Sequence, residues 1–244
     1  MYQEIQPHPL LRPYIETYWM SEDYAEDGDE FSLRVMPDGC VDIIFTFEEG
    51  LLIPLLVGTM TSYQDVSYKG KVKIGGIRFR PGVIKAFVHT PVFEYTDMKI
   101  NMQNVDTLLE KALFEKLQNA QTMKQLFLSL DKYLLTRLPY FIVLDRQIDY
   151  TVKLLEHAGG NIPATILAEK ACLSLRQFER RFKESVGISP KVFSRIIRFR
   201  RLSMILANNP DQSLFDIAFN CGYHDHSHLS KEFKRLSGHT PKGF

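Results

Sequence analysis

Hydrophobic residues recur at helical spacing along the stretch from Ser174 to Gly187. One side of this helix would be apolar and buried against a protein core, since it consists of Leu175, Phe178, Phe182 and Val186. The opposite side would carry positive charge and planar hydrogen-bonding groups, from Arg176, Gln177, Glu179, Arg180 and Lys183. Ser174 stands where an N-cap is expected, and Gly187 where the chain must leave the helix. Such a helix fits the major groove of DNA, although a solvated amphipathic helix has the same pattern.

The same arrangement occurs twice, which favours the DNA-binding interpretation. In the first unit, a short helix over residues 163–171 and a turn of about three residues lead into this stretch. In the second unit, residues 213–216 resemble a capping box, a turn follows at 220–222, and Asp225 caps a helix that runs to Leu236. That helix would bury Leu229, Phe233 and Leu236 and would expose His226, Ser227, Ser230, Lys231, Lys234 and Arg235. Each unit is therefore predicted to be a helix-turn-helix.

A connecting helix is predicted between the two units, over residues 191–207. At 1.5 Å per residue it would span roughly 25 Å, and the two polar faces would then lie about 34 Å apart, one turn of B-DNA. One chain would thus place two helices in successive major grooves. The connector carries five positive charges, suited to phosphate contact or to pairing with acidic neighbours: Lys191, Arg195, Arg198, Arg200 and Arg201.

The N-terminal half has a different pattern. Short runs rich in β-branched and aromatic residues predict strands over 14–20, 31–36, 41–47, 51–57 and 71–79, with Gly75-Gly76 indicating a bulge or a close backbone approach. Helices are predicted over 83–89, 105–117 and 123–138, and another over 146–158 opens the helical C-terminal half. The predicted class is α+β. A β-barrel or cupin-like domain with accessory helices (1–140) would precede an all-α domain of two linked helix-turn-helix units (145–244).

Charge divides the chain in the same way. Residues 145–244 contain 16 Lys and Arg against 10 Asp and Glu, a net charge of +6, whereas the first 144 residues contain 14 against 19, a net charge of −5. A basic C-terminal half indicates a polyanionic partner for that half. No apolar run approaches the ~20 residues of a membrane span, and the N-terminus lacks the pattern of a secretion signal. Cys40, Cys172 and Cys221 are too far apart to suggest a metal site, so we expect reduced thiols in a cytoplasmic protein.

At this point the C-terminal residues show a family resemblance. Residues 145–244 resemble the DNA-binding domain of the AraC/XylS family of bacterial transcription regulators. In the first unit the resemblance lies in Leu167-Ala168, Ser174, Phe178, Arg180, Phe182-Lys183, Gly187 and Ser189-Pro190. In the second unit the resemblance lies in Ile217-Ala218, Gly222-Tyr223, Asp225, Ser227, Leu229-Ser230, Phe233-Lys234, Gly238 and Thr240-Pro241. Cys172 departs from the family pattern, because small residues are usual near that turn.

The resemblance implies double-stranded promoter DNA as the partner, and RNA polymerase as well if the protein is an activator. The positions facing base edges would be Arg176, Glu179, Arg180, His226, Ser227, Ser230 and Lys231. Either arginine can hold guanine with two hydrogen bonds, and Glu179 can accept one from cytosine. Phosphate contacts, which hold the register without reading sequence, would come from Ser174, Lys183, Lys234 and Arg235.

The N-terminal domain weakly resembles the small β-domains that precede this module in uncharacterised members of the family. The implied role is to bind a small-molecule effector or a second subunit of a homodimer. Trp19, Phe45, Arg78 and Phe79 are the candidate effector-binding residues. The three aromatic residues are equally at home in a core, and Arg78 would either meet an anionic ligand or face solvent. The predicted function is a sequence-specific transcription regulator with no catalytic activity, no cofactor and no membrane contact. The alternative is a small-molecule or thiol-modification sensor with only secondary, nonspecific DNA affinity.

Three further hypotheses concern individual residues. His224 and His228 are four apart, but no cysteine or carboxylate completes a metal site except Asp225, which the helix cap requires. A cupin-type metalloenzyme would need a cluster of histidines, whereas residues 1–144 contain only His8 and His89. Cys40, after a turn, is either a modified thiol or an ordinary structural cysteine.

Overall fold

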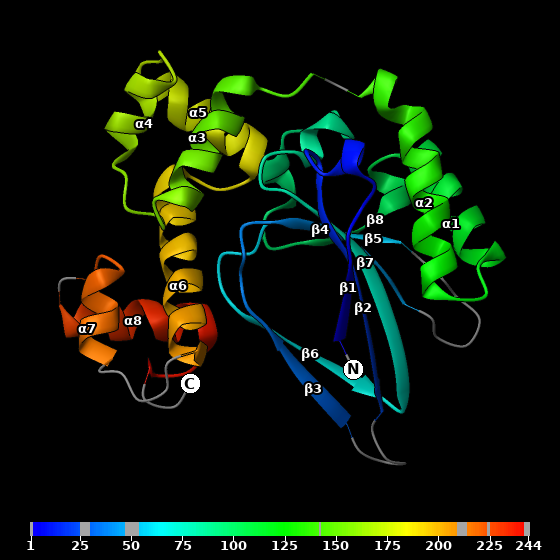
Figure 1. Cartoon of the computed structure of the whole chain (residues 1–244), viewed down its shortest axis with the longest axis horizontal. Helices are drawn as coiled ribbons and strands as arrows, with labels where there is room; N and C mark the ends of the chain where they lie inside the picture. Colours follow the sequence, from blue (N-terminus) through cyan, green and yellow to red (C-terminus); the bar gives the residue numbers. More distant parts are fainter. Residues whose placement is uncertain are drawn as a thin grey trace.

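The chain forms a strand-rich N-terminal domain and a helical C-terminal region that lie side by side (Figure 1). The computed structural model describes residues 2–24, 30–46, 54–141, 143–208, 214–223 and 225–241. The predicted α+β class is confirmed. In the described part of the chain, every helix is too short or too polar to cross a lipid bilayer.

Two antiparallel sheets make up the N-terminal domain. Six strands follow the order β1-β2-β7-β4-β5-β8, and a separate pair joins β3 to β6. The strands are β1 (Tyr2–Ile5), β2 (Ile15–Tyr24), β3 (Glu30–Val35), β4 (Val41–Thr46), β5 (Leu55–Val57), β6 (Gln64–Lys69), β7 (Lys71–Phe79) and β8 (Lys99–Asn101). Four predicted strands coincide with β2, β3, β4 and β7. Of the predicted strand 51–57, β5 covers the end, and 51–53 lie outside the described residues.

Three strands were not predicted from the sequence, for a common physical reason. β1 is mostly exposed, β6 is largely polar, and β8 has three residues. None therefore has a hydrophobic pattern, and their partners in the sheet define them. The glycine pair in β7 does mark a close approach, because a Cβ on Gly76 would lie 2.7 Å from the indole of Trp19.

Helices pack against the larger sheet and complete the N-terminal core. They are the short 3-10 helices η1 (Pro9–Leu11), η2 (Ile84–Ala86), η3 (Val92–Tyr95), η4 (Met102–Asn104) and η5 (Leu138–Tyr140), and the longer α1 (Thr107–Asn119) and α2 (Met123–Arg137). The predicted helix over 83–89 is therefore only the turn η2. The α2 side chains Leu126, Phe127, Leu130 and Leu134 are buried in the core, and Phe127 stacks on Tyr18 of β2 with ring centroids 5.0 Å apart.

The C-terminal region contains α3 (Arg146–His157), α4 (Ala164–Lys170), α5 (Leu175–Val186), α6 (Pro190–Asn208), α7 (Leu214–Asn220) and α8 (His226–Ser237). These bounds lie within one or two residues of the predicted helices. Their inward side chains form a second hydrophobic core, separate from that of the sheet domain. The helix α6 lies on the side of the C-terminal region that faces the sheet domain (Figure 1).

Candidate nucleic-acid interface

The helix α5 has both of its ends fixed by local hydrogen bonds. Ser174 accepts a hydrogen bond from the backbone N–H of Gln177, and the Gln177 side chain accepts one from the Ser174 N–H, which completes a capping box. At the other end Gly187 adopts a left-handed conformation, with φ of +94°. Phe178, Phe182 and Val186 are buried as predicted, whereas Leu175, expected to be buried with them, is 41% exposed. The opposite face is exposed. The capped ends fix which residues face outward.

The helix α8 repeats this design. The carboxylate of Asp225 accepts the N–H of His228 at 2.7 Å, and backbone hydrogen bonds of this kind lower the pKa of Asp225. Gly238 ends the helix with φ of +76°. Leu229, Phe233 and Leu236 are buried. The two helices thus present their polar faces by the same local mechanism.

The turns before α5 and α8 differ at one position. Backbone hydrogen bonds place Cys172 and Gly222 at equivalent points, since each N–H bonds the carbonyl three residues earlier. Gly222 has φ of +84°, whereas Cys172 adopts φ of +53° with a side chain attached. A left-handed conformation costs a non-glycine residue roughly 1–2 kcal/mol. Cys172, the position at which the sequence departs from the family pattern, therefore has a strained backbone conformation in the turn of the first unit.

Replacing Cys172 with glycine is expected to stabilise the C-terminal region. The gain should be about 0.5–1 kcal/mol, because relief of strain is partly offset by the greater freedom of glycine in the unfolded chain. Denaturant unfolding followed by far-UV circular dichroism measures it. Cys172→Ala is the matched control, since it removes the thiol but keeps the Cβ. An equal gain in both variants would contradict strain as the cause.

The helix α6 contacts the second helix of both helix-turn-helix units, α5 and α8, through buried phenylalanines. Phe182 of α5 packs on Phe193 of α6 with ring centroids 5.6 Å apart, and Phe233 of α8 packs on Phe199 with centroids 5.1 Å apart. These four rings are all buried. With 19 residues, α6 is about 28 Å long. These apolar contacts therefore attach α5 and α8, the two helices with exposed polar faces, to the same rigid helix, α6.

The residues predicted to contact DNA are mostly on the surface. Exposed positions are Ser174, Arg176, Glu179, Arg180, Lys183, Ser227, Lys231, Lys234 and Arg235, and Ser230 is half-buried. Arg180 pairs with Glu184 at 3.0 Å, but its side chain is 64% exposed, so the pair is weak and easily exchanged for a phosphate or a base. The side chain of His226, and His224 as a whole, lie outside the described residues.

Most connector charges have partners within the protein. Arg195 donates to the buried carboxylate of Glu232 on α8, and Arg198 lies over the ring of Tyr223. Arg200 donates to the backbone carbonyl of Asp38 in the N-terminal domain at 2.9 Å. Only Lys191 and Arg201 of the five are exposed. Of the two roles the sequence allowed, pairing with an acidic neighbour describes Arg195 and also Arg200, which lies 3.9 Å from Glu16, whereas Arg198 contacts an aromatic ring.

The N-terminal domain holds the carboxyl end of each polar-faced helix. Thr59 donates its hydroxyl to the carbonyl of Val186 at 2.7 Å, and Thr96 donates to that of Gly187 at 2.8 Å. Arg34 donates to the carbonyl of Ser237, at the end of α8, at 3.3 Å. Lys183 lies 5.1 Å from the centre of the Phe93 ring. Sequence patterns gave no signal for these contacts, since the partners lie far apart along the chain.

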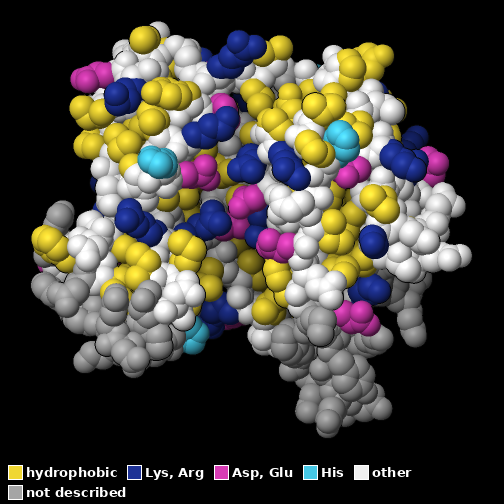
Figure 2. All heavy atoms as spheres, viewed as in Figure 1, with side chains coloured by type: hydrophobic (Ala, Val, Ile, Leu, Met, Phe, Trp, Pro, Cys, Tyr) yellow, Lys and Arg dark blue, Asp and Glu magenta, His cyan; other side chains and the backbone are white. Residues whose placement is uncertain are grey.

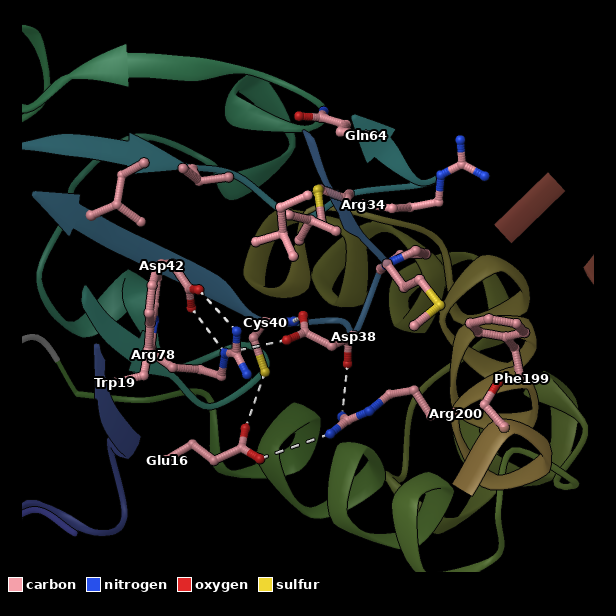
Figure 3. Close-up of a pocket in the computed structure, with 18 of the residues that line it drawn as sticks. Glu16, Trp19, Arg34, Asp38, Cys40, Asp42, Gln64, Arg78, Phe199 and Arg200 are labelled. Carbon is pink, nitrogen blue, oxygen red and sulfur yellow. Dashed lines mark hydrogen bonds and ion pairs between the residues drawn. The ribbon is translucent and has the colours of Figure 1, made fainter. Parts of the chain in front are cut away.

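A cavity of about 1050 Å³ lies between the sheet domain and α6. Trp19 and Arg78, two of the candidate effector-binding residues, line it (Figure 3). The other two do not: Phe45 and Phe79 are 0% and 1% exposed and belong to the sheet core. Cys40 is also at the cavity, where its thiol donates to Glu16 at 3.1 Å and burial raises the pKa of the thiol well above its usual range.

Comparison with known proteins agrees with this architecture. Residues 3–101 match a domain of unknown function (DUF6597), and residues 167–244 match a helix-turn-helix domain. The chain is 29% identical over 99 residues to the HTH-type transcriptional activator RhaS of Escherichia fergusonii, covering 40% of this chain and 35% of RhaS. It is 32% identical over 87 residues to RhaS of Klebsiella pneumoniae, covering 36% and 31%. The matches thus span about a third of the length of these curated relatives.

Among solved structures, ToxT from Vibrio cholerae O395 aligns over 93% of this chain and 96% of its own, with 11% identity and a TM-score of 0.46. The helix-turn-helix match covers both capped units, and the DUF6597 match covers the strand-rich domain. The chain therefore combines an N-terminal DUF6597 domain with a C-terminal helix-turn-helix domain of the AraC type, similar to that of the RhaS activators.

Proposed function

We propose that the protein is a transcription regulator that binds specific sequences in double-stranded DNA through α5 and α8. The observation that carries this proposal is the pair of capped helices, each fixed to α6 by buried phenylalanines and each exposing polar and basic side chains. One duplex can then be read at two places by one chain.

The proposed base-reading residues lie towards the amino end of each helix. Arg176 and Arg180 would each make two hydrogen bonds to a guanine, and Glu179 would accept one from a cytosine. In α8, Ser227, Ser230 and Lys231 would have the same role, with His226. Ser174, Lys234 and Arg235 would contact phosphates and hold the register. Lys183, the fourth proposed phosphate contact, differs from the others because its ammonium group lies over the ring of Phe93. It would have to leave that ring to reach a phosphate.

The N-terminal domain would control this binding. It contacts the carboxyl ends of α5 and α8, opposite to the ends proposed to enter the grooves. A small-molecule effector or a second subunit that shifts the sheet domain would therefore move both helices. An activator of this kind would also contact RNA polymerase.

The thiol-modification alternative is less favoured. A reactive cysteine is accessible and has a lowered pKa, because the thiolate is the nucleophile. Cys40 is 5% exposed and burial raises its pKa. A sensor that depends on this thiol would first have to open the cavity.

Selection from a random duplex library tests the function. The full chain should enrich a defined sequence, and Arg176→Ala or Arg180→Ala should weaken binding to that duplex about 10–100-fold while binding to unselected DNA changes little. Lys234→Ala should weaken binding to the selected duplex and to unselected DNA alike. It should also lower the slope of log affinity against log salt concentration by about 1. Arg137→Ala, an exposed arginine on α2, is the control and should change neither. Failure to enrich any sequence would contradict the proposal.

A further inference from the structure

The two helix-turn-helix units contact each other as well as α6. Figures 1 and 2 show the first unit above the second, on the same side of the hollow between the two domains. The contact joins the loop between α3 and α4, which leads into the first unit, to the turn between α7 and α8 in the second. We call this contact the unit junction, and it consists of Gly160, Asn161, Arg198, Gly222 and Tyr223.

The loop after α3 is fixed against the backbone of α6. Gly159 and Gly160 are buried, and both have positive φ, of +59° and +80°. A Cβ on Gly160 would lie 2.3 Å from the carbonyl oxygen of Ser194 and 3.1 Å from the backbone nitrogen of Arg198. Glycine allows two backbones to approach this closely. Asn161, the next residue, is therefore held beside α6.

The turn of the second unit meets this loop. The side chain of Asn161 lies against Gly222, because a Cβ on Gly222 would be 2.2 Å from the Oδ1 atom of Asn161. Gly222 is the counterpart of Cys172, which is exposed in the turn of the first unit. The first turn thus accommodates a side chain, whereas the corresponding space in the second turn is occupied by Asn161 from the other unit.

Arg198 of α6 joins the loop to the turn. A Cβ on Gly160 would lie 2.9 Å from its Cγ, so the aliphatic stem of Arg198 packs on the loop. Its Nη1 donates to the carbonyl of Gly222 at 3.4 Å, and its guanidinium lies over the ring of the buried Tyr223, 5.6 Å from the centroid. The same half-buried side chain therefore contacts both units.

We propose that Arg198 is a positioning residue that fixes the second unit relative to the first. It would thereby set the spacing between the two half-sites, the blocks of base pairs read by α5 and by α8, so this role rests on the proposed function. One base pair inserted between the half-sites moves the second by about 3.4 Å and rotates it by about 35°. Units locked in one arrangement cannot follow that rotation, whereas a loosened junction lets α8 follow it at a cost in affinity.

Duplexes of different spacing test this role. For the full chain, one base pair inserted into the selected duplex should weaken binding about tenfold, because the contacts of one half-site are lost. Arg198→Met keeps the stem but removes the donor and the charge. It should bind the selected duplex about fivefold more weakly than the parent does, and the insertion should then weaken binding only about twofold. Asn161→Ala should lower the tenfold discrimination to about fivefold, and the fold should survive it because Asn161 is exposed.

Arg201→Met is the matched control. Arg201 is an exposed arginine of the same helix and lies against the same loop, since a Cβ on Gly159 would be 2.5 Å from its Nη1. The change in charge is therefore the same as in Arg198→Met. Loss of a phosphate contact by Arg201 would weaken binding at every spacing equally, so the tenfold discrimination should remain.

Two outcomes with DNA would overturn the proposal. One is an unchanged discrimination in Arg198→Met, because general destabilisation lowers binding at every spacing alike. The other is a parent protein that binds both spacings equally. If the library selection enriches no sequence, the proposed function fails and the spacing role fails with it.

Hydrogen exchange without DNA separates these failures. The amides of residues 220–223 should exchange about tenfold faster in Arg198→Met than in the parent and should be unchanged in Arg201→Met. Equal exchange in the parent and Arg198→Met would show that Arg198 does not join the units, whether or not the protein selects a DNA sequence.

Discussion

Replacement of Glu232 by glutamine is expected to destabilise the C-terminal region by about 3 kcal/mol. Glu232 is 2% exposed and accepts a hydrogen bond from Arg195, so this pair joins α8 to α6 inside the second unit. Removing one partner of a buried pair leaves the other charge uncompensated, at a cost of about 3–5 kcal/mol. The lower figure applies because the Arg195 side chain remains 25% exposed and reaches water.

Far-UV circular dichroism in denaturant measures this effect, since the C-terminal region is all helix. Fluorescence of the single tryptophan, Trp19, separately reports the sheet domain and should show a smaller change. Glu184→Gln is the matched control, because Glu184 pairs with Arg180 on the exposed face of α5 and should cost less than about 1 kcal/mol. Similar losses of unfolding free energy in Glu232→Gln and Glu184→Gln would contradict the prediction that burial makes the Glu232–Arg195 pair more important for stability.

Replacement of Gly39 by alanine is expected to cost about 2–5 kcal/mol and to loosen the contact between the domains. Gly39 has φ of +86°, which strains any other residue by roughly 1–2 kcal/mol. A Cβ there would also lie 2.6 Å from the ring of Phe193 on α6, and overpacking of this kind costs about 1–3 kcal/mol. The next residue back, Asp38, bonds Arg200 through its carbonyl, so the same turn makes two contacts with α6.

Gly70→Ala separates these two contributions. Gly70 also has a positive φ, of +65°, but a Cβ there would have no atom within 4 Å, so only the strain of about 1–2 kcal/mol should remain. Thermal unfolding compares the two variants, and proteolysis near residues 139–146 reports separation of the domains. Affinity for the selected duplex should change in Gly39→Ala but not in Gly70→Ala. Equal behaviour of the two variants would show that the turn does not transmit between domains.

Local chemistry made the helix-turn-helix units predictable from the sequence. Ser174 and Asp225 begin their helices and Gly187 and Gly238 end them through bonds to residues at most four positions away. The spacing of the buried phenylalanines then settles which face points outward. The same reasoning found the strands with strong hydrophobic runs, but it missed β1, β6 and β8, which form through pairing with distant strands.

The sequence by itself determined where α5 and α8 lie, most of the side chains they expose and that the C-terminal half is basic. Only the tertiary structure decided that Arg195 and Arg200 contact internal partners, that Phe45 and Phe79 are core, and that Trp19 and Arg78 line a cavity shared with α6. The reason is the range of the interactions. Caps and helical periodicity act over a few residues, whereas an ion pair or a cavity wall depends on how segments far apart in the chain pack together.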